Sequence, residues 1–445
     1  MWLKPVLLAA LLLASGGLYA ADADDRLLQL IQDFNASLVE LEVPRLQLGY
    51  LENLNAIQDQ ASREQQEARF SALKISLDAL RLENLDPDNQ YRKQHLDYNL
   101  TMLLRRLDLE RRYRDSVSGE VISTEGIYHQ PLGKDWYQYF LDSWLSVSLT
   151  PEELFVFGEN EVMKVQQQIN DVRRQTGFED DEPGFYSYLN GERFLVSDIE
   201  EVAQGYHEKT RMVQEKIGSL FNEKFELDVS IIPFPESNKD TPPGQFATLE
   251  SPTFLFNFYQ EKHNSQDMDF LVLHEVIPGH WYHNQYDQHS GYDNKGLGVI
   301  WAYHGLSEGW GAYVEELGEE LGLYREPTAK MGKLKFDLVR SARVVLDVGI
   351  NYFGWDNQQA LDYWHGQLKG QDAIAQREID RVRRWPGQAI SYKVGAKTIM
   401  DLRTEAESML RDDFDIREFH HLVMGFGGVP LFLVEKRVND FLSPG

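Results

Sequence analysis

The spacing of apolar residues divides the chain into a helical first part, a strand-like middle and a helical remainder. In the first part, apolar side chains recur at three- and four-residue intervals at Leu27, Leu28, Ile31, Phe34 and Leu38. Residues 51–86 contain no Gly or Pro, and Pro87 follows them. This period is that of an α-helix, so residues 24–114 are predicted to be mostly helical. Thr150, followed by proline and two glutamates, is typical of a helix start, and this helix is predicted to run to about Arg174.

The period changes in the middle of the chain. Residues 229–232 and 253–259 are strand-like, and a Pro-Pro-Gly turn lies between them. Helical spacing then returns over residues 306–322, 335–351, 358–369, 395–411 and 433–441. Regular alternation of strands and helices is missing, so the predicted fold class is mainly α with a small mixed β-sheet.

The composition is that of an acidic globular protein. Hydrophobic residues make up 42% of the 445 residues, and the formal net charge is −27. A chain of this length can bury a large core, in one large domain or in two packed domains. Binding to nucleic acid requires a basic surface, so this charge argues against a nucleic-acid partner. Because the chain has no cysteine, any metal must be held by His, Asp or Glu.

The N-terminus has the pattern of a secretory signal peptide. Lys4 supplies the positive start, Val6 to Ala14 is an apolar run, and small residues lead to a cleavage site predicted after Ala20 or Ala23. A bilayer-spanning helix needs roughly 18 apolar residues, which is longer than this run. Residues 1–23 are therefore predicted to be removed. Lipid attachment would require a cysteine, so we expect a soluble periplasmic or secreted protein with no integral membrane segment after signal removal.

The segment His274-Glu275-Val276-Ile277-Pro278-Gly279-His280 carries the most specific chemistry in the sequence. In the zinc-peptidase pattern H-E-x-x-H, the two histidines lie four positions apart and share one helix face. Here they lie six positions apart, and a regular helix would turn them away from each other. Pro278 removes a backbone N–H and Gly279 permits unusual backbone angles, so a locally opened helix can bring His280 back to His274.

A metal site of this kind also needs a base and a third ligand. Glu275 occupies the position of the carboxylate that takes a proton from water in zinc peptidases. Glu308 lies between small residues at 305, 309 and 311 that suit close approach of another helix. It is the candidate third ligand and would leave one coordination position open. The alternative for each residue is a hydrogen-bonded polar side chain without a metal, and both interpretations stay open.

Several spaced segments together resemble a known bacterial family. After the first motif come Ser307-Glu-Gly-Trp-Gly-Ala-Tyr313, Arg340–Gly349 with Gly354-Trp355, Trp385–Gly395, and Phe419-His420 before Pro430-Leu431. In this order they resemble the family called domain of unknown function 885, over roughly residues 130–440. The resemblance implies one large mature domain, 24–445, made of an N-terminal helical part to residue 130 and a catalytic part over 131–445.

The same resemblance implies a zincin-like fold of the gluzincin type and metal-dependent hydrolysis. It implies one zinc ion held by His274, His280 and Glu308, with Glu275 as the base. The expected protein is a metallopeptidase, similar to a dipeptidase or carboxypeptidase, that acts on a peptide or small amide. One departure is Asn351, which stands where the family leads us to expect a histidine and puts specificity or activity in doubt.

Peptide hydrolysis further requires a donor for the oxyanion and groups that bind the substrate. Tyr392 is the candidate donor, with core packing as the alternative. Arg343 and Lys393 are candidates for binding a substrate carboxylate, with internal salt bridges as the alternative. The weaker candidates for substrate binding are His304, His420 and Asn351. The strand predicted over 253–259 is a candidate for pairing with an extended peptide, although a buried strand is the default.

Two other functions compete with the metallopeptidase. Gly305-Leu306-Ser307-Glu308-Gly309 fits the serine-hydrolase pattern G-x-S-x-G, with a strand-like segment over 299–303 before it. Asp347 and His420 follow Ser307 in the order of a triad, but the repeated βα units of that fold are missing from the pattern. The third possibility is a binding protein that kept the fold and lost activity, which Asn351 favours.

Overall fold

A computed structural model describes residues 4–117, 122–239, 241–248, 250–289, 297–298, 300–425 and 427–443, with side chains from residue 22 onwards. Over these residues the chain folds mainly into helices, with two small sheets, which confirms the mainly α fold class. The chain divides into two compact units, residues 1–122 with 293–302, and residues 123–292 with 303–445.

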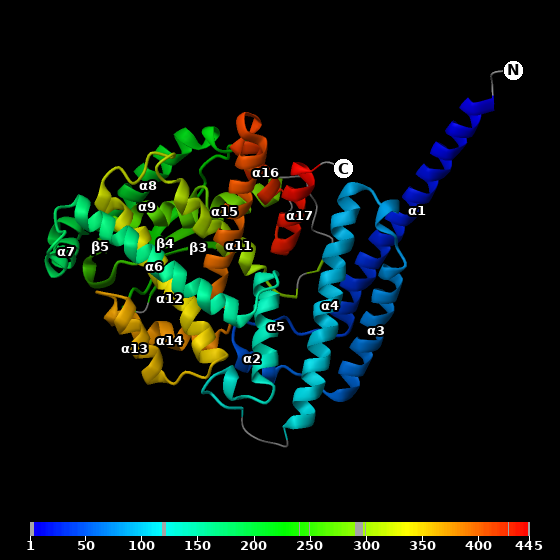
Figure 1. The fold of residues 1–445 in the computed structure, drawn as a ribbon, viewed down its shortest axis with the longest axis horizontal. Coiled ribbons are helices and arrows are strands. Elements are labelled where there is room, and N and C mark those ends of the chain that lie inside the picture. The colour runs from blue at the N-terminus through cyan, green and yellow to red at the C-terminus, as the bar shows by residue number, and fades with distance from the viewer. Residues whose placement is uncertain are drawn as a thin grey trace. The chain divides into compact units, whose positions relative to one another are not determined.

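The first unit is a helical bundle. Its helices are α1 (Lys4–Glu40), α2 (Tyr50–Asn55), α3 (Gln60–Asp78) and α4 (Pro87–Ser116). α1, α3 and α4 lie side by side (Figure 1), with Phe34 of α1 against Phe70 of α3. Asp59 and Asp86 cap α3 and α4 by accepting from backbone N–H groups of the first turn. The helical period predicted for residues 24–114 is confirmed.

The predicted signal peptide falls at the start of α1. Residues 4–23 continue without a break into the rest of this helix, which ends at Glu40, and residues 1–3 lie outside the described part of the chain. Among the helices that the structure describes, none combines the length and the apolar character that crossing a lipid bilayer requires.

The second unit contains the remaining helices. They are α5 (Gly133–Leu145), α6 (Pro151–Gln175), α7 (Glu182–Leu189), α8 (Ile199–Lys216), α9 (Met268–Leu271), α10 (His280–His289), α11 (His304–Val314), α12 (Met331–Asn351), α13 (Asn357–Gln367), α14 (Ala375–Arg384), α15 (Ser391–Leu410), α16 (Ile416–Met424) and α17 (Leu431–Leu442). α6 begins where predicted, because Thr150 and Glu153 form a reciprocal capping box. α12 packs along α6 (Figure 1), and an apolar core lies between these two helices and α7, α13 and α14.

α11 and α15 approach each other at glycines. A Cβ atom added to Gly309 would overlap the Cα atom of Gly395, and one added to Gly395 would overlap the carbonyl oxygen of Gly305. The two backbones are therefore in direct contact, as predicted from the small residues around Glu308. This crossing sets the position of α11 in the second unit.

The principal sheet of this unit has three strands, β2 (Ser230–Pro233), β3 (Gly244–Thr248) and β4 (Pro252–Phe256). β4 is central, with β2 parallel to it on one side and β3 antiparallel on the other, so the sheet is mixed as predicted. The two-residue strands β1 (Leu195–Val196) and β5 (His263–Asn264) form a separate antiparallel pair. Because both edges of β4 are occupied, the strand predicted over 253–259 cannot pair with an extended peptide, and β3 is an edge strand instead.

Candidate metal centre

The segment that carries the two histidines is interrupted and does not form one continuous helix. α9 is followed by a π-helical turn over Val272–Val276, and Ile277 is then extended, with φ −134° and ψ 122°. The peptide bond between Ile277 and Pro278 is cis, and α10 begins at His280. The indole Nε1 of Trp310 donates to the carbonyl oxygen of Pro278 at 2.8 Å, which joins this interruption to α11. A proline has no N–H with which to continue the helix, so the chain restarts at His280.

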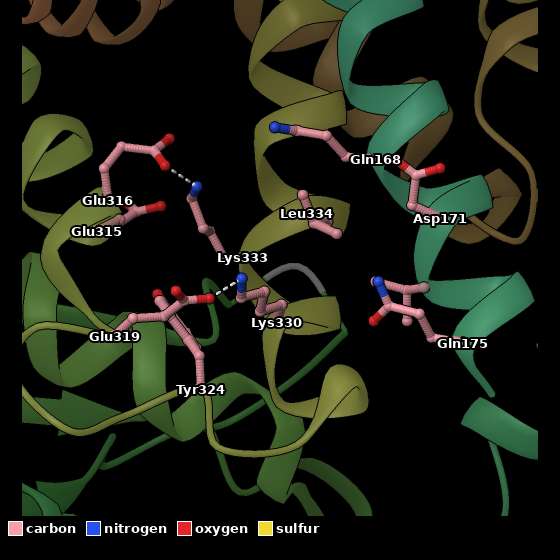
Figure 2. A pocket seen from close by; sticks show the side chains of 11 residues that line it. Gln168, Asp171, Gln175, Glu315, Glu316, Glu319, Tyr324, Lys330, Lys333 and Leu334 are labelled. Atoms are coloured by element: carbon pink, nitrogen blue, oxygen red, sulfur yellow. Dashed lines mark ion pairs between the residues drawn. The ribbon is translucent and has the colours of Figure 1, made fainter.

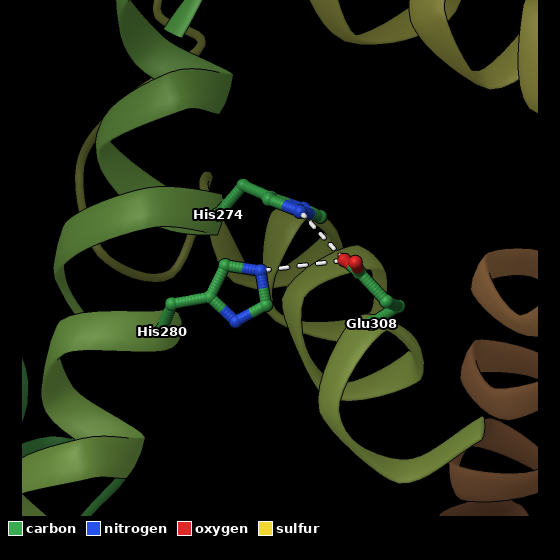
Figure 3. A group of neighbouring side chains, drawn as sticks. All are labelled: His274, His280 and Glu308. Atoms are coloured by element: carbon green, nitrogen blue, oxygen red, sulfur yellow. Dashed lines mark ion pairs between the residues drawn. The ribbon is translucent and has the colours of Figure 1, made fainter. Parts of the chain in front are cut away.

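This interruption places the two histidines beside each other and opposite Glu308 (Figure 3). The ring centroids of His274 and His280 are 4.9 Å apart. Glu308 Oε2 on α11 lies 3.7 Å from His274 Nε2 and 3.4 Å from His280 Nε2. Each residue offers one ligand atom, and these atoms all lie within 4.8 Å of one another. The three residues predicted as metal ligands are therefore brought together.

Behind His274, a buried ion pair fixes the orientation of the imidazole. His274 Nδ1 donates to Glu315 Oε1 at 2.8 Å, and the same carboxylate accepts from Arg340 Nη1 at 2.7 and 2.9 Å. Glu315 is 1% exposed, so these contacts are made out of water. A carboxylate on Nδ1 keeps the proton there and leaves Nε2 facing Glu308, the arrangement that metal-ligating histidines use.

Sequence reasoning missed Glu315 and Arg340, although a signal for Glu315 exists. Glu308, Gly311 and Glu315 follow one another at three- and four-residue intervals, so they share one face of a helix. Gly311 was predicted to allow close helix packing, but its missing side chain makes room for the ring of His274, a candidate metal ligand. A Cβ atom at Gly311 would lie 2.7 to 2.9 Å from atoms of the His274 ring.

The electrostatics of the cluster favour a cation at its centre. Burial alone would lower the pKa of His274, but the carboxylates of Glu308 and Glu315 raise it to about 9. Burial alone would raise the pKa of Glu308, but His274 and His280 hold it well below its usual range. The cluster therefore keeps its carboxylates ionised and stabilises positive charge between them.

Glu275 and Tyr392 lie beside this cluster. Glu275 Oε2 accepts from the backbone N–H of Phe246 in β3 at 2.8 Å, and its charge contributes to the raised pKa of His274. The ring of Tyr392, in the first turn of α15, is stacked on the His274 ring at 6.2 Å between centroids. The Tyr392 hydroxyl oxygen accepts from Arg381 Nη2 at 3.2 Å. Both candidates for catalysis are thus placed at the cluster.

The two candidates for binding a substrate carboxylate are occupied by internal partners. Arg343 Nη2 lies 2.6 Å from Glu378 Oε2, and both side chains are buried. Lys393 Nζ lies 2.7 Å from Asp337 and 2.7 Å from Glu161. Both residues therefore take the internal salt bridges that the sequence left open as the alternative.

Of the weaker candidates, only His304 is placed near the cluster. It lies one helical turn before Glu308, with its ring 5.2 Å from that of Trp144, and its pKa is lowered chiefly by burial. Asn351 is buried in α12, and its Nδ2 donates to the Val382 carbonyl oxygen at 3.0 Å. The departure from the expected histidine therefore falls on a residue that packs within the helical core.

The serine-hydrolase alternative is contradicted by the contacts of His420. Its Nε2 contacts the Tyr313 hydroxyl at 2.8 Å and its Nδ1 contacts the Leu220 carbonyl oxygen at 2.7 Å, which leaves neither nitrogen for Ser307. Burial lowers the pKa of His420 to about 3. Residues 300–303 form no strand, and residue 299 lies outside the described part of the chain. The triad and the strand–turn–helix context are both missing, and His420 does not reach the cluster.

Glu315 also lines a cavity of about 350 Å³ (Figure 2). The charged side chains that line it include Glu316, Glu319, Lys330 and Lys333. Lys333 Nζ lies 2.6 Å from Glu316 Oε2, and Lys330 forms an ion pair with Glu319. The cations of this cavity are thus paired with its own carboxylates.

Comparison with known proteins gives a family and a fold. A family model described as "bacterial protein of unknown function" (DUF885) matches residues 99–438. A solved structure of a candidate lipoprotein from Colwellia psychrerythraea is 24% identical, with a TM-score of 0.68 over 96% of this chain and 76% of that chain. A second, of a candidate lipoprotein of unknown function from Shewanella oneidensis, is 16% identical, with a TM-score of 0.56 over 84% and 72%. None of the curated proteins matches. At these identities the likeness concerns the fold.

Proposed function

Because the chain belongs to the DUF885 family of bacterial proteins, whose function is unknown, we propose a function from the site itself: metal-dependent hydrolysis of a peptide bond. The observation that carries the proposal is the cluster of His274, His280 and Glu308. Two segments separated in sequence supply three ligand atoms of the kinds that zinc prefers, within 4.8 Å of one another.

The residues fit a zinc ion by three criteria. Two imidazoles and one carboxylate form the ligand set of many catalytic zinc sites, and three protein ligands leave a coordination position open. Glu315 holds His274 from behind, as a carboxylate does in such sites. The cluster also stabilises positive charge, as the raised pKa of His274 indicates. When bound, zinc supplies Lewis acidity, which polarises a carbonyl group and makes water a better nucleophile near neutral pH.

The side chains around the cluster have matching roles. Glu275 is held by the Phe246 N–H, and as general base it takes a proton from the attacking water. The water oxygen bonds to the carbonyl carbon, the C–N bond breaks, and the same proton passes to the leaving amine. The Tyr392 hydroxyl accepts from Arg381, so its own proton is free to be donated to the developing oxyanion.

A peptide is the favoured substrate because an edge strand lies beside Glu275. The Phe246 N–H of β3 points to Glu275 and away from β4, so the outer edge of β3 faces the site. An extended peptide can add to such an edge by main-chain hydrogen bonds. This arrangement, a mainly helical fold with one small sheet beside the metal ligands, supports a zincin-like architecture of the gluzincin type.

We also propose that the protein acts outside the cytoplasm. The charge pattern and apolar run of residues 1–23 support export by a signal peptide. The proteins of similar fold from Colwellia psychrerythraea and Shewanella oneidensis are described as lipoproteins, which supports a periplasmic or extracellular location.

The test combines metal content with hydrolysis. We expect the purified protein to bind one zinc ion per chain, and a mixed peptide library to be cleaved until a chelator is added. Glu275→Gln should keep the zinc and lose hydrolysis, because the amide still accepts from Phe246 but cannot take a proton. Glu316→Gln, which removes the exposed carboxylate that pairs with Lys333, is the matched control and should remain active.

Two results would overturn this proposal. Activity that survives chelation, with labelling of Ser307 by a fluorophosphonate, would establish a serine enzyme. Tight zinc binding without turnover of any library peptide would establish a binding protein on the same fold.

A further inference from the structure

We propose that Arg381 forms a carboxylate-binding subsite beside the metal cluster, so that the substrate is a peptide with a free C-terminal carboxylate close to the cleaved bond. This inference rests on the proposed peptidase function and adds the substrate class. It assigns to Arg381 the role that the sequence had suggested for Arg343 and Lys393, both of which are neutralised by internal carboxylates.

The first observation is a local surplus of positive charge. One buried carboxylate, Glu378, serves two guanidinium groups: its Oε2 accepts from Arg343, and its Oε1 accepts from Arg377. Both of its oxygens are therefore occupied, and Arg381 is a third cation nearby that helps to lower the pKa of Glu378, after Arg343. Three guanidinium groups therefore lie around Glu378, and Arg381 has no carboxylate within ion-pair distance in the part of the chain that the structure describes.

The second observation is that Arg381 has only neutral hydrogen-bond partners among the residues that the structure describes. Its Nη2 donates to the Gln388 side-chain oxygen at 3.0 Å and to the Tyr392 hydroxyl at 3.2 Å. Its Nε is buried and has no hydrogen-bond partner in the part of the chain that the structure describes. A partly buried guanidinium normally pairs with a carboxylate, and this one has an unused donor. The missing partner is an anion that the protein does not itself supply.

The third observation is the position of Arg381 relative to the reacting groups. Its Nη2 contacts the hydroxyl of Tyr392, whose ring is stacked on His274. Burial alone would lower the pKa of Arg381, but Tyr392, Glu378 and the proposed metal ligand Glu308 together raise it. One side chain, Tyr392, therefore connects the guanidinium with the metal cluster. An anion bound at Arg381 would lie close to a carbonyl group placed at the Tyr392 hydroxyl.

The chemistry of this subsite favours a carboxylate. A guanidinium binds a carboxylate through two parallel N–H donors, which gives direction as well as charge. The proximity of Arg381 to Tyr392 leaves little room between the bound carboxylate and the cleaved bond. The product released from the C-terminal side is therefore short, as in a carboxypeptidase or dipeptidase. The lysines of the cavity that Glu315 lines offer no equivalent site, because they are paired with Glu316 and Glu319.

The experiment compares matched ligands that differ only at the C-terminus. Hydrolysis of peptides with a free carboxylate is measured beside hydrolysis of the same peptides as C-terminal amides. Binding of N-acetyl-Ala-Ala and of its amide is measured by calorimetry on the zinc-loaded Glu275→Gln protein. Both measurements are repeated with Arg381→Gln, Arg381→Lys and Arg384→Gln. Arg381→Lys keeps the positive charge but loses the two parallel N–H donors of the guanidinium group. Arg384 lies on the same helix and is exposed, so it is the control.

We expect the unsubstituted protein to bind the acid more tightly than the amide. Arg381→Gln should weaken binding of the acid by about 10- to 100-fold, the effect of losing a hydrogen bond to a charged group, and leave the amide unchanged. Arg381→Lys should restore part of the preference, and Arg384→Gln should keep all of it. Zinc content and the thermal unfolding midpoint, measured on each variant, establish that the fold and the cluster are intact.

Three outcomes would overturn the inference. The first is equal binding of acid and amide by the unsubstituted protein, and the second is an unchanged preference in both Arg381 variants. The third is equal weakening for acid and amide, which would make Arg381 a positioning residue for Tyr392. If neither peptide form is hydrolysed although zinc is bound, the proposed peptidase function fails. The calorimetric comparison still decides whether Arg381 binds a carboxylate.

Discussion

Replacing Glu315 by Gln tests whether the ion pair behind His274 tunes a metal site. Glu315 Oε1 accepts from both His274 Nδ1 and Arg340 Nη1, and Oε2 accepts from Arg340 as well. A glutamine has one accepting oxygen and one NH2 group. Whichever way the amide is turned, its NH2 faces the N–H of Arg340 or that of His274. The substitution therefore loses at least one contact and leaves the Arg340 charge without its buried partner.

Two magnitudes follow from this geometry. Loss of the group that orients a ligating histidine lowers metal affinity by about 10- to 100-fold, which corresponds to about 1.4 to 2.7 kcal/mol. Breaking a buried ion pair by removing one partner costs about 3 to 5 kcal/mol of the free energy of unfolding. Because Glu315 is 1% exposed, solvent screening does little to reduce this second effect.

The assay is competition for zinc between the protein and a chromophoric chelator, with the free energy of unfolding of the apo protein measured in urea. Glu316→Gln is the control, because Glu316 is the next residue, pairs with Lys333 and has a side chain that is 44% exposed. We expect Glu316→Gln to change zinc affinity less than twofold. Unchanged zinc affinity in a folded Glu315→Gln protein would refute the role of Glu315, and so would an equal loss in both variants.

Three further predictions concern the same region. Gly311→Ala should lower zinc affinity at least about 10-fold, because the added Cβ meets the His274 ring, whereas Gly366→Ala in α13, where a Cβ atom meets nothing within 4 Å, should leave zinc affinity unchanged. Tyr392→Phe should lower kcat by about 100-fold at unchanged zinc affinity in steady-state assays, and an unchanged kcat would remove Tyr392 as oxyanion donor. The imidazole of His420 is held neutral, with its pKa lowered by burial from 6.5 to about 3, so its contribution to stability is present above pH 6.5 and is lost as the pH falls toward 3. Between pH 6.5 and 5, the free energy of unfolding measured in urea should therefore fall by about 2 kcal/mol less in His420→Gln than in the unsubstituted protein. An equal fall in both proteins would contradict this.

Much of the fold was predictable because local signals agreed with the tertiary structure. Thr150 predicted a helix start that packing did not alter, and Pro87, which follows the first helical stretch, lies at the start of α4. The strand-like segments became β2 and β4, but β3 was not predicted, because Gly244–Thr248 adjoins the predicted turn and lacks a strong strand period. Pairing between distant segments decides which strand lies at the edge of the sheet, so the local sequence pattern cannot predict it.

The metal ligands were predictable, whereas the groups that surround them were not. We could identify His274, His280 and Glu308 from the sequence, because metal chemistry restricts which residue types can be ligands and how far apart they can lie. Arg343 and Lys393 were equally reasonable anchors for a substrate until their internal partners were known. The charge that remains without a partner depends on how the carboxylates of several helices are shared, and this is a property of the folded structure alone.

The glycine contact between α11 and α15 has a mechanical consequence. Glu308 immediately precedes Gly309, and Tyr392 lies one turn before Gly395, so a ligand and the proposed oxyanion donor flank the same crossing. No layer of side chains separates the two backbones there, and peptide backbone is far stiffer than a rotatable side chain. The two helices should therefore behave as a single rigid frame. Residues around the substrate can then be redesigned for a new specificity while the spacing of Glu308 and Tyr392 is preserved.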